Sequence, residues 1–394
     1  MRGAKILICS VSVGTGHTRA AQALKEAWER LLPGGEADIC DLFREFSPVL
    51  HSLIFDSYLF LARHFPAFYR FLYFRAERDE GPVGAFKKKL FLNGLVFFLG
   101  HSVKTYINHL QPEVVVCTHP FTILLLAEMK ARGYVNVPVA GVMTDFIDHP
   151  YWVHPAADLY FVPAPEIGNC LVRKGLAPEK IFPLGIPLHR AFQTQPSRRQ
   201  MKEKLGLSPF QPVALLIGGG LGFGGLEEAA ALLLEHFSGL FLLAVAGKNR
   251  ELQNRLEELS GRYPGRMRVF GFIDNVHELM AAADFAITKP GGLTIAEALA
   301  RGLPMVFFRP IPGHEERNAH FAVAAGAACW AETQEDLVTA VAELLNRDGR
   351  LAAMSQAAAQ VGKPLAADHI ARRIRDFLAE QGREKGGKSS DAAL

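Results

Sequence analysis

Two glycine-rich turns carry the residues of this chain that are best suited to chemistry. The first reads GTGHTRAAQAL over 14–24 and places His17 at the first turn of the helix that follows. The second reads TKPGGLTIAEAL over 288–299 and places Glu297 about one turn into its helix. Glycines let the N–H groups at a helix start approach a phosphate, and the helix dipole adds positive potential there. Both turns therefore indicate a ligand that bears phosphate.

Neither turn fits the usual dinucleotide site. In the first, Arg19 stands where a third glycine would pack helix against strand, which disfavours an NAD oxidoreductase. In the second, a carboxylate would repel a nearby diphosphate, so Glu297 requires a hydroxyl-bearing partner such as ribose. The alternative at this turn is a capping box in which Thr294 pairs with Glu297.

Further strand ends in the second half point to the same kind of site. They are IGGGLGFGG (217–225), VAGKNRE (245–251) and VFGFIDNVHELM (269–280). The carboxyl ends of parallel strands meet at one edge of a sheet, where ligands bind. Together with the 288–299 turn, they predict a nucleotide pocket.

Composition limits the class of protein. The chain has 394 residues, 49% of them hydrophobic and 21% charged, which indicates a folded protein of two or three domains. A net charge of +3 gives no argument for nucleic acid, and five scattered cysteines without a CxxC pair indicate a reducing compartment. No signal peptide is recognised, and the apolar run at 90–100 is shorter than the ~20 residues that span a bilayer. We expect a cytoplasmic protein, with contact to a membrane surface left open.

Apolar runs alternate with helical patterns twice along the chain, which predicts an α/β protein with a parallel sheet in each half. Two Rossmann-like domains that face each other across a cleft are the expected result. The first domain spans 1–190 with a helical insertion at about 47–110, and the second spans 191–365 after a polar linker. Helical periodicity at 350–381 ends in a segment, 366–381, that returns to the first domain, and the tail 382–394 is expected to be disordered.

Five motifs in order carry a family resemblance. They are GTGHTRAAQAL (14–24), TDFIDHPYWVHPAADLYFV (144–162), LGIPLHRAF (184–192), GFIDNVHELMAAADFAITKPGGLTIAEAL (271–299) and PIPGHEERNA (310–319). Over about residues 4–375 the chain resembles the processive diacylglycerol glucosyltransferases and the monogalactosyldiacylglycerol synthases, and more distantly the N-acetylglucosaminyltransferase of lipid II synthesis. The resemblance implies the GT-B fold. It also implies transfer of a hexose from a UDP-sugar to the 3-hydroxyl of diacylglycerol, with inversion and without a metal ion or cofactor.

The resemblance also implies a donor site in the second half. In it, Glu297 binds the ribose, the backbone of Phe272 and Ile273 holds the uracil, and His314 and Glu315 read the hexose. The family usually has Gln where His314 stands, so glucose and galactose both remain open. The backbone N–H groups and neighbouring side chains expected around the uracil and the diphosphate belong to Gly219, Gly220, Lys248, Asn249, Gly291, Gly292, Leu293 and Thr294.

The first half is then the acceptor side, with Gly16, His149 and Trp152 at the acceptor. Two catalytic roles for His17 are open: general base toward the attacking hydroxyl, or support of the leaving diphosphate together with the glycine N–H groups. The alternative is a histidine that is only hydrogen-bonded to its own loop. A helix N-terminus lowers a histidine pKa and so favours the neutral base. Asp145 is the competing base, the partner that orients the base, or a turn cap. Trp152 is a flat wall beside the lipid or a core aromatic.

The insertion mixes aromatic and basic residues, including Lys87, Lys88 and Lys89. This composition suits an interfacial helix that binds anionic headgroups, and the alternative is an ordinary core helix with snorkelling lysines.

We therefore expect a peripheral enzyme on the inner face of the cell membrane, with UDP-hexose, diacylglycerol and anionic lipids as partners and with a homodimer left open. The alternatives are transfer to another lipid such as a polyprenyl diphosphate, epimerisation of a UDP-sugar, and a non-catalytic UDP-sugar sensor.

Overall fold

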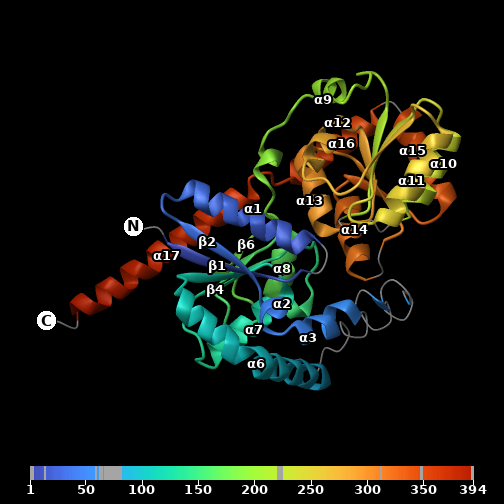
Figure 1. Ribbon diagram of the computed structural model, residues 1–394. Helices are drawn as coiled ribbons and strands as arrows, with labels where there is room; N and C mark the ends of the chain where they lie inside the picture. The colour runs from blue at the N-terminus through green and yellow to red at the C-terminus, as the bar shows by residue number, and fades with distance from the viewer. Residues whose placement is uncertain are drawn as a thin grey trace.

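Each half of the chain forms a parallel six-stranded sheet with helices on both faces, as Figure 1 shows. The computed structural model describes residues 4–12, 15–57, 60, 61, 65, 82–219, 225–310, 313–346 and 349–391, without the side chains of 82–85, 87 and 383–391. The strand order is β2-β1-β3-β4-β5-β6 in the first half and β12-β11-β10-β7-β8-β9 in the second. The predicted α/β class and pair of parallel sheets are confirmed.

The strands form because their sequences are short apolar runs that are buried on both faces, as is usual in parallel sheets. All four residues of VVVC in β3 are buried, and so are all five of VALLI in β7. The first sheet comprises β1 Lys5–Ser10, β2 Glu36–Asp41, β3 Val114–Cys117, β4 Val139–Val142, β5 Leu159–Phe161 and β6 Ile181–Phe182. The second comprises β7 Val213–Ile217, β8 Phe241–Val245, β9 Met267–Phe270, β10 Phe285–Thr288, β11 Met305–Phe308 and β12 Ala328–Ala331.

Helices cover the two faces of each sheet. In the first half, α1 and α17 pack on one face of the sheet, and α6 and α7 pack with the other face. The helices of this half are α1 Gly16–Leu31, α2 Leu42–Phe46, α3 Pro48–His51, α6 Pro82–Leu110, α7 Pro120–Ala131, α8 Pro165–Arg173 and α17 Ala366–Asp391, with short turns η1 Ser52–Asp56, η2 Pro150–Trp152 and η3 Pro178–Lys180. The linker carries η4 Arg190–Gln193, and the second half carries α9 Arg198–Lys204, α10 Leu226–His236, α11 Arg250–Arg262, α12 Val276–Ala282, α13 Gly292–Arg301, α14 His314–Ala324, α15 Gln334–Asn346 and α16 Arg350–Val361.

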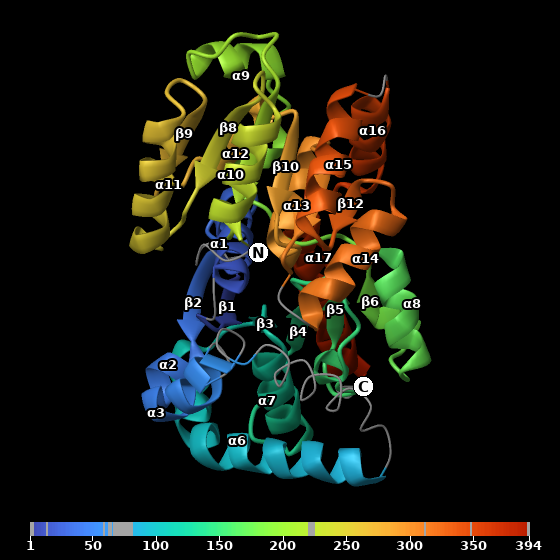
Figure 2. The ribbon, with the colours of Figure 1, turned by 90° about the vertical axis from the view of Figure 1, so that its right-hand side faces the viewer.

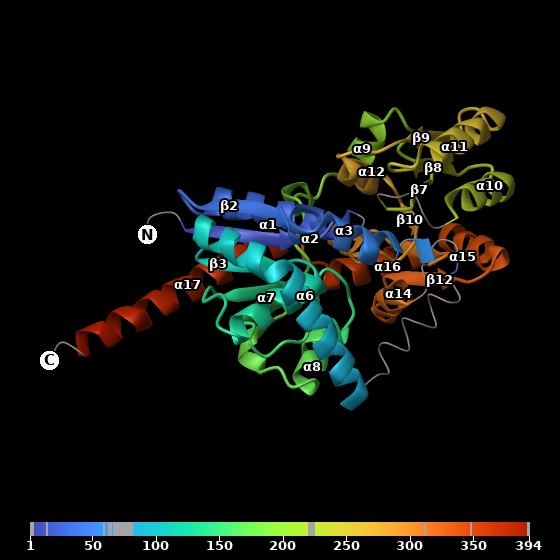
Figure 3. The same cartoon turned by 60° about the horizontal axis from the view of Figure 1, so that its bottom comes forward.

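The C-terminal helix lies on the first half. Figures 1 and 3 show α17 running beside α1 and projecting past the sheet. Arg30 of α1 pairs with Asp368 of α17 at 2.5 Å. The periodic segment 350–381 is two helices, because Gly362 and Pro364 interrupt it between α16 and α17. The helix then continues to Asp391 through residues expected to be disordered, since extending a formed helix is easier than starting one.

Helix α6 of the insertion lies across the end of the first half that is farthest from the second half (Figure 2). Its stretch Lys88–Leu110 has the length and the mean hydropathy, 1.2, of a bilayer-spanning segment. The apolar stretch is therefore longer than the run expected at 90–100. However, the side chains of Leu95, Leu99 and Val103 are buried in the core of the first half. By length and composition the stretch could cross a bilayer, but one side of the helix packs into the core of the first half.

Candidate active site

The two halves touch at the carboxyl ends of their sheets, where both glycine turns lie. A Cβ placed on Gly292 would collide with the carbonyl oxygen of Thr144 and come within 2.7 Å of Asp145 Oδ1. A Cβ on Gly16 would lie 3.7 Å from Leu293 Cβ. The start of α13 therefore packs directly against the start of α1 and the end of β4. This close approach is the reason for glycine at 292.

His17 lies at this junction with one ring nitrogen engaged. Its Nδ1 is 2.9 Å from the carbonyl oxygen of Thr118 and 2.7 Å from Thr144 Oγ1. A carbonyl oxygen can only accept, so Nδ1 carries the proton and donates. In the neutral ring, the lone pair is then on Nε2, which is the tautomer that a general base needs.

Burial lowers the pKa of His17, an effect that the Asp145 carboxylate opposes and that His314 of the second half reinforces. The ring is therefore held neutral, as a base must be. The same interactions bring together Asp145 and His314, which were predicted from separate motifs. His119 adds a T-shaped ring contact at 4.6 Å between centroids.

Asp145 is bound from across the junction, not by His17. Asn318 of α14 donates from Nδ2 to Asp145 Oδ1 at 2.9 Å and accepts from the N–H of Phe146 at 2.7 Å. The amide is completely buried and ties the end of β4 to the second half. Asn318 and Thr144 were not predicted as site residues, although both lie inside the motifs that carried the resemblance. A buried amide in such a motif was the available signal.

The start of α13 is the segment predicted to bind the diphosphate. Its N-cap is Gly291, without a side-chain cap, so Thr294 is the third helical residue and the predicted capping-box alternative with Glu297 is wrong. The first helical N–H groups, those of Gly292, Leu293 and Thr294, have no partner within the helix by geometry. The N–H of Gly291 differs, because it donates to the Lys289 carbonyl at 2.9 Å and is not free for a diphosphate as predicted.

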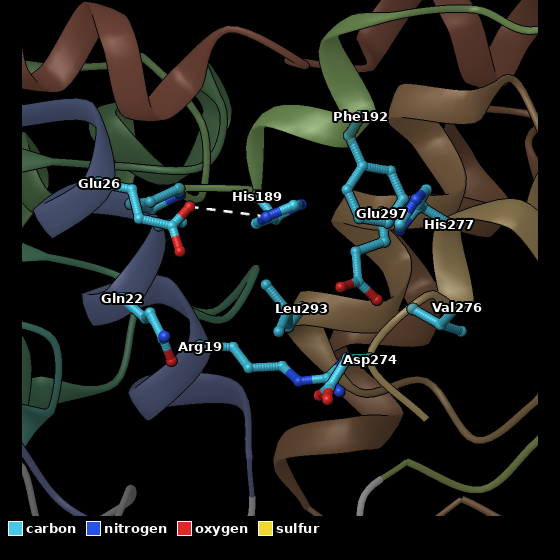
Figure 4. Close-up of a pocket in the computed structure, with 12 residues that line it drawn as sticks. Arg19, Gln22, Glu26, His189, Phe192, Asp274, Val276, His277, Leu293 and Glu297 are labelled. Atoms are coloured by element: carbon cyan, nitrogen blue, oxygen red, sulfur yellow. Dashed lines mark ion pairs between the residues drawn. The ribbon is translucent and has the colours of Figure 1, made fainter. Parts of the chain in front are cut away.

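Glu297 lines a cavity of about 190 Å³ between the halves. Figure 4 shows its carboxylate pointing into this cavity, while Arg19 extends from α1 toward Asp274. Glu297 is 6% exposed, and burial raises its pKa to about 7, with Arg19 acting in the opposite direction. The other lining residues are Gln22, Ala23, Glu26, Pro187, His189, Phe192, Val276, His277 and Leu293.

The predicted uracil segment borders this cavity and is contacted by Arg19. The Arg19 Nη2 donates to the Ile273 carbonyl at 3.2 Å, and its Cζ lies 5.5 Å from the centre of the Phe272 ring. Lys248 Nζ lies 5.2 Å from the same ring centre. Asn249 instead caps α11, since its Oδ1 accepts from the Leu252 N–H at 3.0 Å. Arg19 was noted in the sequence only because it replaces the third glycine of a dinucleotide motif. In the structure its side chain reaches the donor half.

A second charged pair lies beside the predicted hexose readers. Glu315 is 1% exposed and its Oε1 pairs with Lys289 Nζ. Gly219, in the left-handed region at φ 66°, lies against Lys289, whose Cε would be 3.4 Å from a Cβ there. Lys289 therefore lies between Gly219 and Glu315, the second of the two residues predicted to bind the hexose. Gly220 lies outside the described residues.

The segment 149–154, which contains the predicted acceptor residues His149 and Trp152 and is called the acceptor segment, follows β4. His149 accepts at Nδ1 from the Tyr151 N–H at 3.2 Å, and burial lowers its pKa to about 4. Trp152 is 1% exposed and packs in the core of the first half, so its indole forms no open wall. The short turn η2 directs it inward.

Two of the three predicted membrane lysines can be placed by their side chains, and they differ. Lys88 Nζ donates to the carbonyls of Pro150 at 3.1 Å and of Val153 at 3.0 Å. It points into the protein, so the expectation that it meets headgroups is wrong. Lys89 is exposed, and the Lys87 side chain lies outside the described residues. Across the residues whose side chains are described, no three His, Cys, Asp or Glu gather into a group that could hold a metal ion.

Comparisons with known proteins identify the family of the chain. The family model for monogalactosyldiacylglycerol (MGDG) synthase matches residues 17–188, and the model for the C-terminal domain of glycosyltransferase family 28 matches residues 213–370. A processive diacylglycerol beta-glucosyltransferase of Bacillus licheniformis is 30% identical over 353 residues, with 89% of each chain covered. One from Bacillus cereus is 29% identical over 384 residues, with 96% of this chain and 95% of that one covered.

Solved structures support the fold. The Acinetobacter baumannii MurG structure has a TM-score of 0.61 at 17% identity and covers 95% of this chain and 99% of its own. A putative UDP-N-acetylglucosamine 2-epimerase from Listeria monocytogenes has a TM-score of 0.60 at 17% identity and covers 96% and 97%. Both halves thus adopt the expected GT-B arrangement. The chain belongs to the glycosyltransferase family that contains the processive diacylglycerol glucosyltransferases and the monogalactosyldiacylglycerol synthases.

Proposed function

We propose that the protein transfers a hexose from UDP-glucose or UDP-galactose to the 3-hydroxyl of diacylglycerol, with inversion and without a metal ion. The observation that carries this proposal is the junction of His17 with the start of α13. A neutral imidazole whose Nε2 carries the lone pair lies beside helix-start N–H groups, so a base and an anion site occupy one place. The names of the curated relatives favour glucose over galactose.

In the proposed step, the acceptor oxygen attacks the anomeric carbon from the side opposite the diphosphate. The new C–O bond forms as the bond to the diphosphate oxygen breaks, which inverts the configuration. His17 Nε2 takes the hydroxyl proton, and the N–H groups of Gly292, Leu293 and Thr294 stabilise the charge of the leaving UDP. Asp145 raises the pKa of His17 and so favours the imidazolium that forms.

The remaining donor contacts follow from the cavity. Glu297 accepts the ribose hydroxyls, and the backbone of Phe272 and Ile273 holds the uracil at the side that Arg19 reaches. His314 and Glu315 read the hexose, with Lys289 holding Glu315 in place.

We place the protein at the membrane surface through α6, α3 and η1. Large apolar side chains are exposed on these elements, among them Val49 at 81%, Leu53 at 67%, Phe86 at 67% and Phe97 at 82%. Exposed aromatic and aliphatic residues on one end of a domain suit insertion into one leaflet. Figure 2 shows that end facing away from the second half, which leaves the donor half clear of the bilayer.

The proposed function is tested with vesicles that contain diacylglycerol and anionic lipid. The protein is incubated with UDP-glucose, UDP-galactose or UDP-N-acetylglucosamine, and the lipids are resolved. We expect a hexosyl lipid from one of the first two donors, with inverted configuration and in the presence of a chelator. A polyprenyl acceptor, an altered UDP-sugar without lipid product, or donor binding without turnover would each support one of the alternatives and refute the proposal.

A further inference from the structure

The acceptor segment is held by a lysine from the helix below it. Lys88 of α6 donates to the carbonyls of Pro150 and Val153, at 3.1 and 3.0 Å, and these two carbonyls flank Tyr151 and Trp152. One ammonium therefore spans the whole of η2. Hydrogen bonds from a charged donor are about twice as strong as neutral ones.

The surroundings show that Lys88 belongs to the interior. Its side chain is half-buried, and burial lowers its pKa, with Glu128 of α7 acting in the opposite direction. Glu128 also binds His154 Nε2 at 3.0 Å, at the other end of the acceptor segment. Phe91, about one turn along α6, stacks on Tyr151 with ring centres 6.1 Å apart and planes at 13°. Helix α6 therefore contacts this segment through the hydrogen bonds of the Lys88 ammonium and through the stacking of Phe91 on Tyr151.

The opposite side of α6 is exposed. Phe86 is 67% exposed, Leu90 is 62% exposed, and Lys89 between them is also exposed. Residues one and two positions from Lys88 point to other sides of a helix, so the exposed and the buried groups share the same turn. This turn therefore connects the surface proposed to meet lipid with the segment predicted to hold the acceptor.

We propose that Lys88 is a positioning residue that couples the lipid-facing side of α6 to the acceptor segment 149–154. The proposal rests on the proposed function for the identity of the acceptor. When α6 is seated on the bilayer, Lys88 holds the two carbonyls and sets the segment relative to His17. Without the ammonium, the segment is released while the donor site is unchanged.

The test compares Lys88→Met, Lys88→Arg and a matched control, Lys104→Met, which removes an exposed lysine of the same helix. Losing these two bonds is expected to raise the apparent KM for diacylglycerol in vesicles at least tenfold, since about 1.4 kcal/mol is tenfold in an equilibrium. The affinity for UDP-glucose and the sedimentation with vesicles should not change. Lys88→Arg should restore most of the loss, because a guanidinium also donates twice, and Lys104→Met should match the wild type.

Two further measurements separate the possible failures. Faster amide hydrogen exchange at 149–154 in Lys88→Met, but not in Lys104→Met, would support the role of Lys88 in holding this segment, even if the wild type makes no lipid product. Absence of lipid product in the wild type would overturn the proposed function alone. Loss of vesicle sedimentation in Lys88→Met would show that Lys88 binds headgroups and would overturn the inference. An unchanged KM with unchanged exchange would overturn it as well. A lowered melting temperature with no rescue by Lys88→Arg would show a purely structural role.

Discussion

Donor binding should depend on pH through Glu297. Its carboxylate lines the interdomain cavity, and burial raises its pKa to about 7 from an ordinary value of 4.5. Only the ionised form accepts two ribose hydroxyls. The binding-competent fraction is then about 0.1 at pH ~6 and about 0.9 at pH ~8, and the apparent affinity scales with that fraction. We expect UDP-glucose to bind about tenfold more tightly at the higher pH.

The assay is isothermal titration calorimetry with UDP-glucose and no lipid acceptor. UDP-glucose is preferred to UDP because it lacks the terminal phosphate that titrates near pH ~6. Glu297→Gln should bind weakly and lose the pH dependence. Arg19→Met should move the midpoint to higher pH, because the guanidinium is the charge that opposes the effect of burial on Glu297. A flat profile in the wild type, or the same slope in Glu297→Gln, would refute this assignment of Glu297.

Three further predictions concern the junction of the halves. Glu297→Gln should stabilise the ligand-free protein by up to about 3 kcal/mol at pH ~8 and little at pH ~5, since a raised pKa removes stability as pH rises through it; thermal melts at both pH values check this, and equal shifts would contradict it. His17→Ala should lower kcat about 10²- to 10⁴-fold and leave UDP-glucose affinity intact, so an equal loss of binding in calorimetry would argue against a base. Gly292→Ala should lower kcat about 100-fold, because its Cβ collides with Thr144 and separates the reacting groups by about an ångström; an unchanged rate would show that the halves need not meet there.

The parts of the structure that follow from local patterns could be predicted from the sequence. Uninterrupted apolar runs such as VVVC and VALLI indicate parallel strands, because a strand of a parallel sheet is buried on both faces of the sheet. The glycine turn before α13 could also be predicted, because a glycine pair there follows a strand and opens a helix, but its contact with Thr144 could not. The order of motifs then suggested which turns face each other.

The parts that depend on the direction of a side chain could not be predicted. Lys88 and Lys89 are neighbours in one basic triplet, yet only the helix phase decides that the first turns inward. Trp152 is directed into the core by a three-residue turn that has no apolar period of its own. Asn318 acts across the halves on Asp145, a partner 173 positions away in the chain, so no local pattern could reveal it.

The return of the last helix to the first half has a mechanical consequence. The chain passes between the halves twice, and the two passages touch, because a Cβ on Gly185 would lie 2.6 Å from Lys363 Cβ and 3.0 Å from Ala366 Cβ. Because these two connecting segments pack side by side, they form a single hinge between the halves. We expect the two halves to rock about this contact and not to slide past each other, because sliding would separate the two passages of the chain. A chain truncated at residue 365 would therefore lose part of this hinge and also α17, which covers one face of the first sheet.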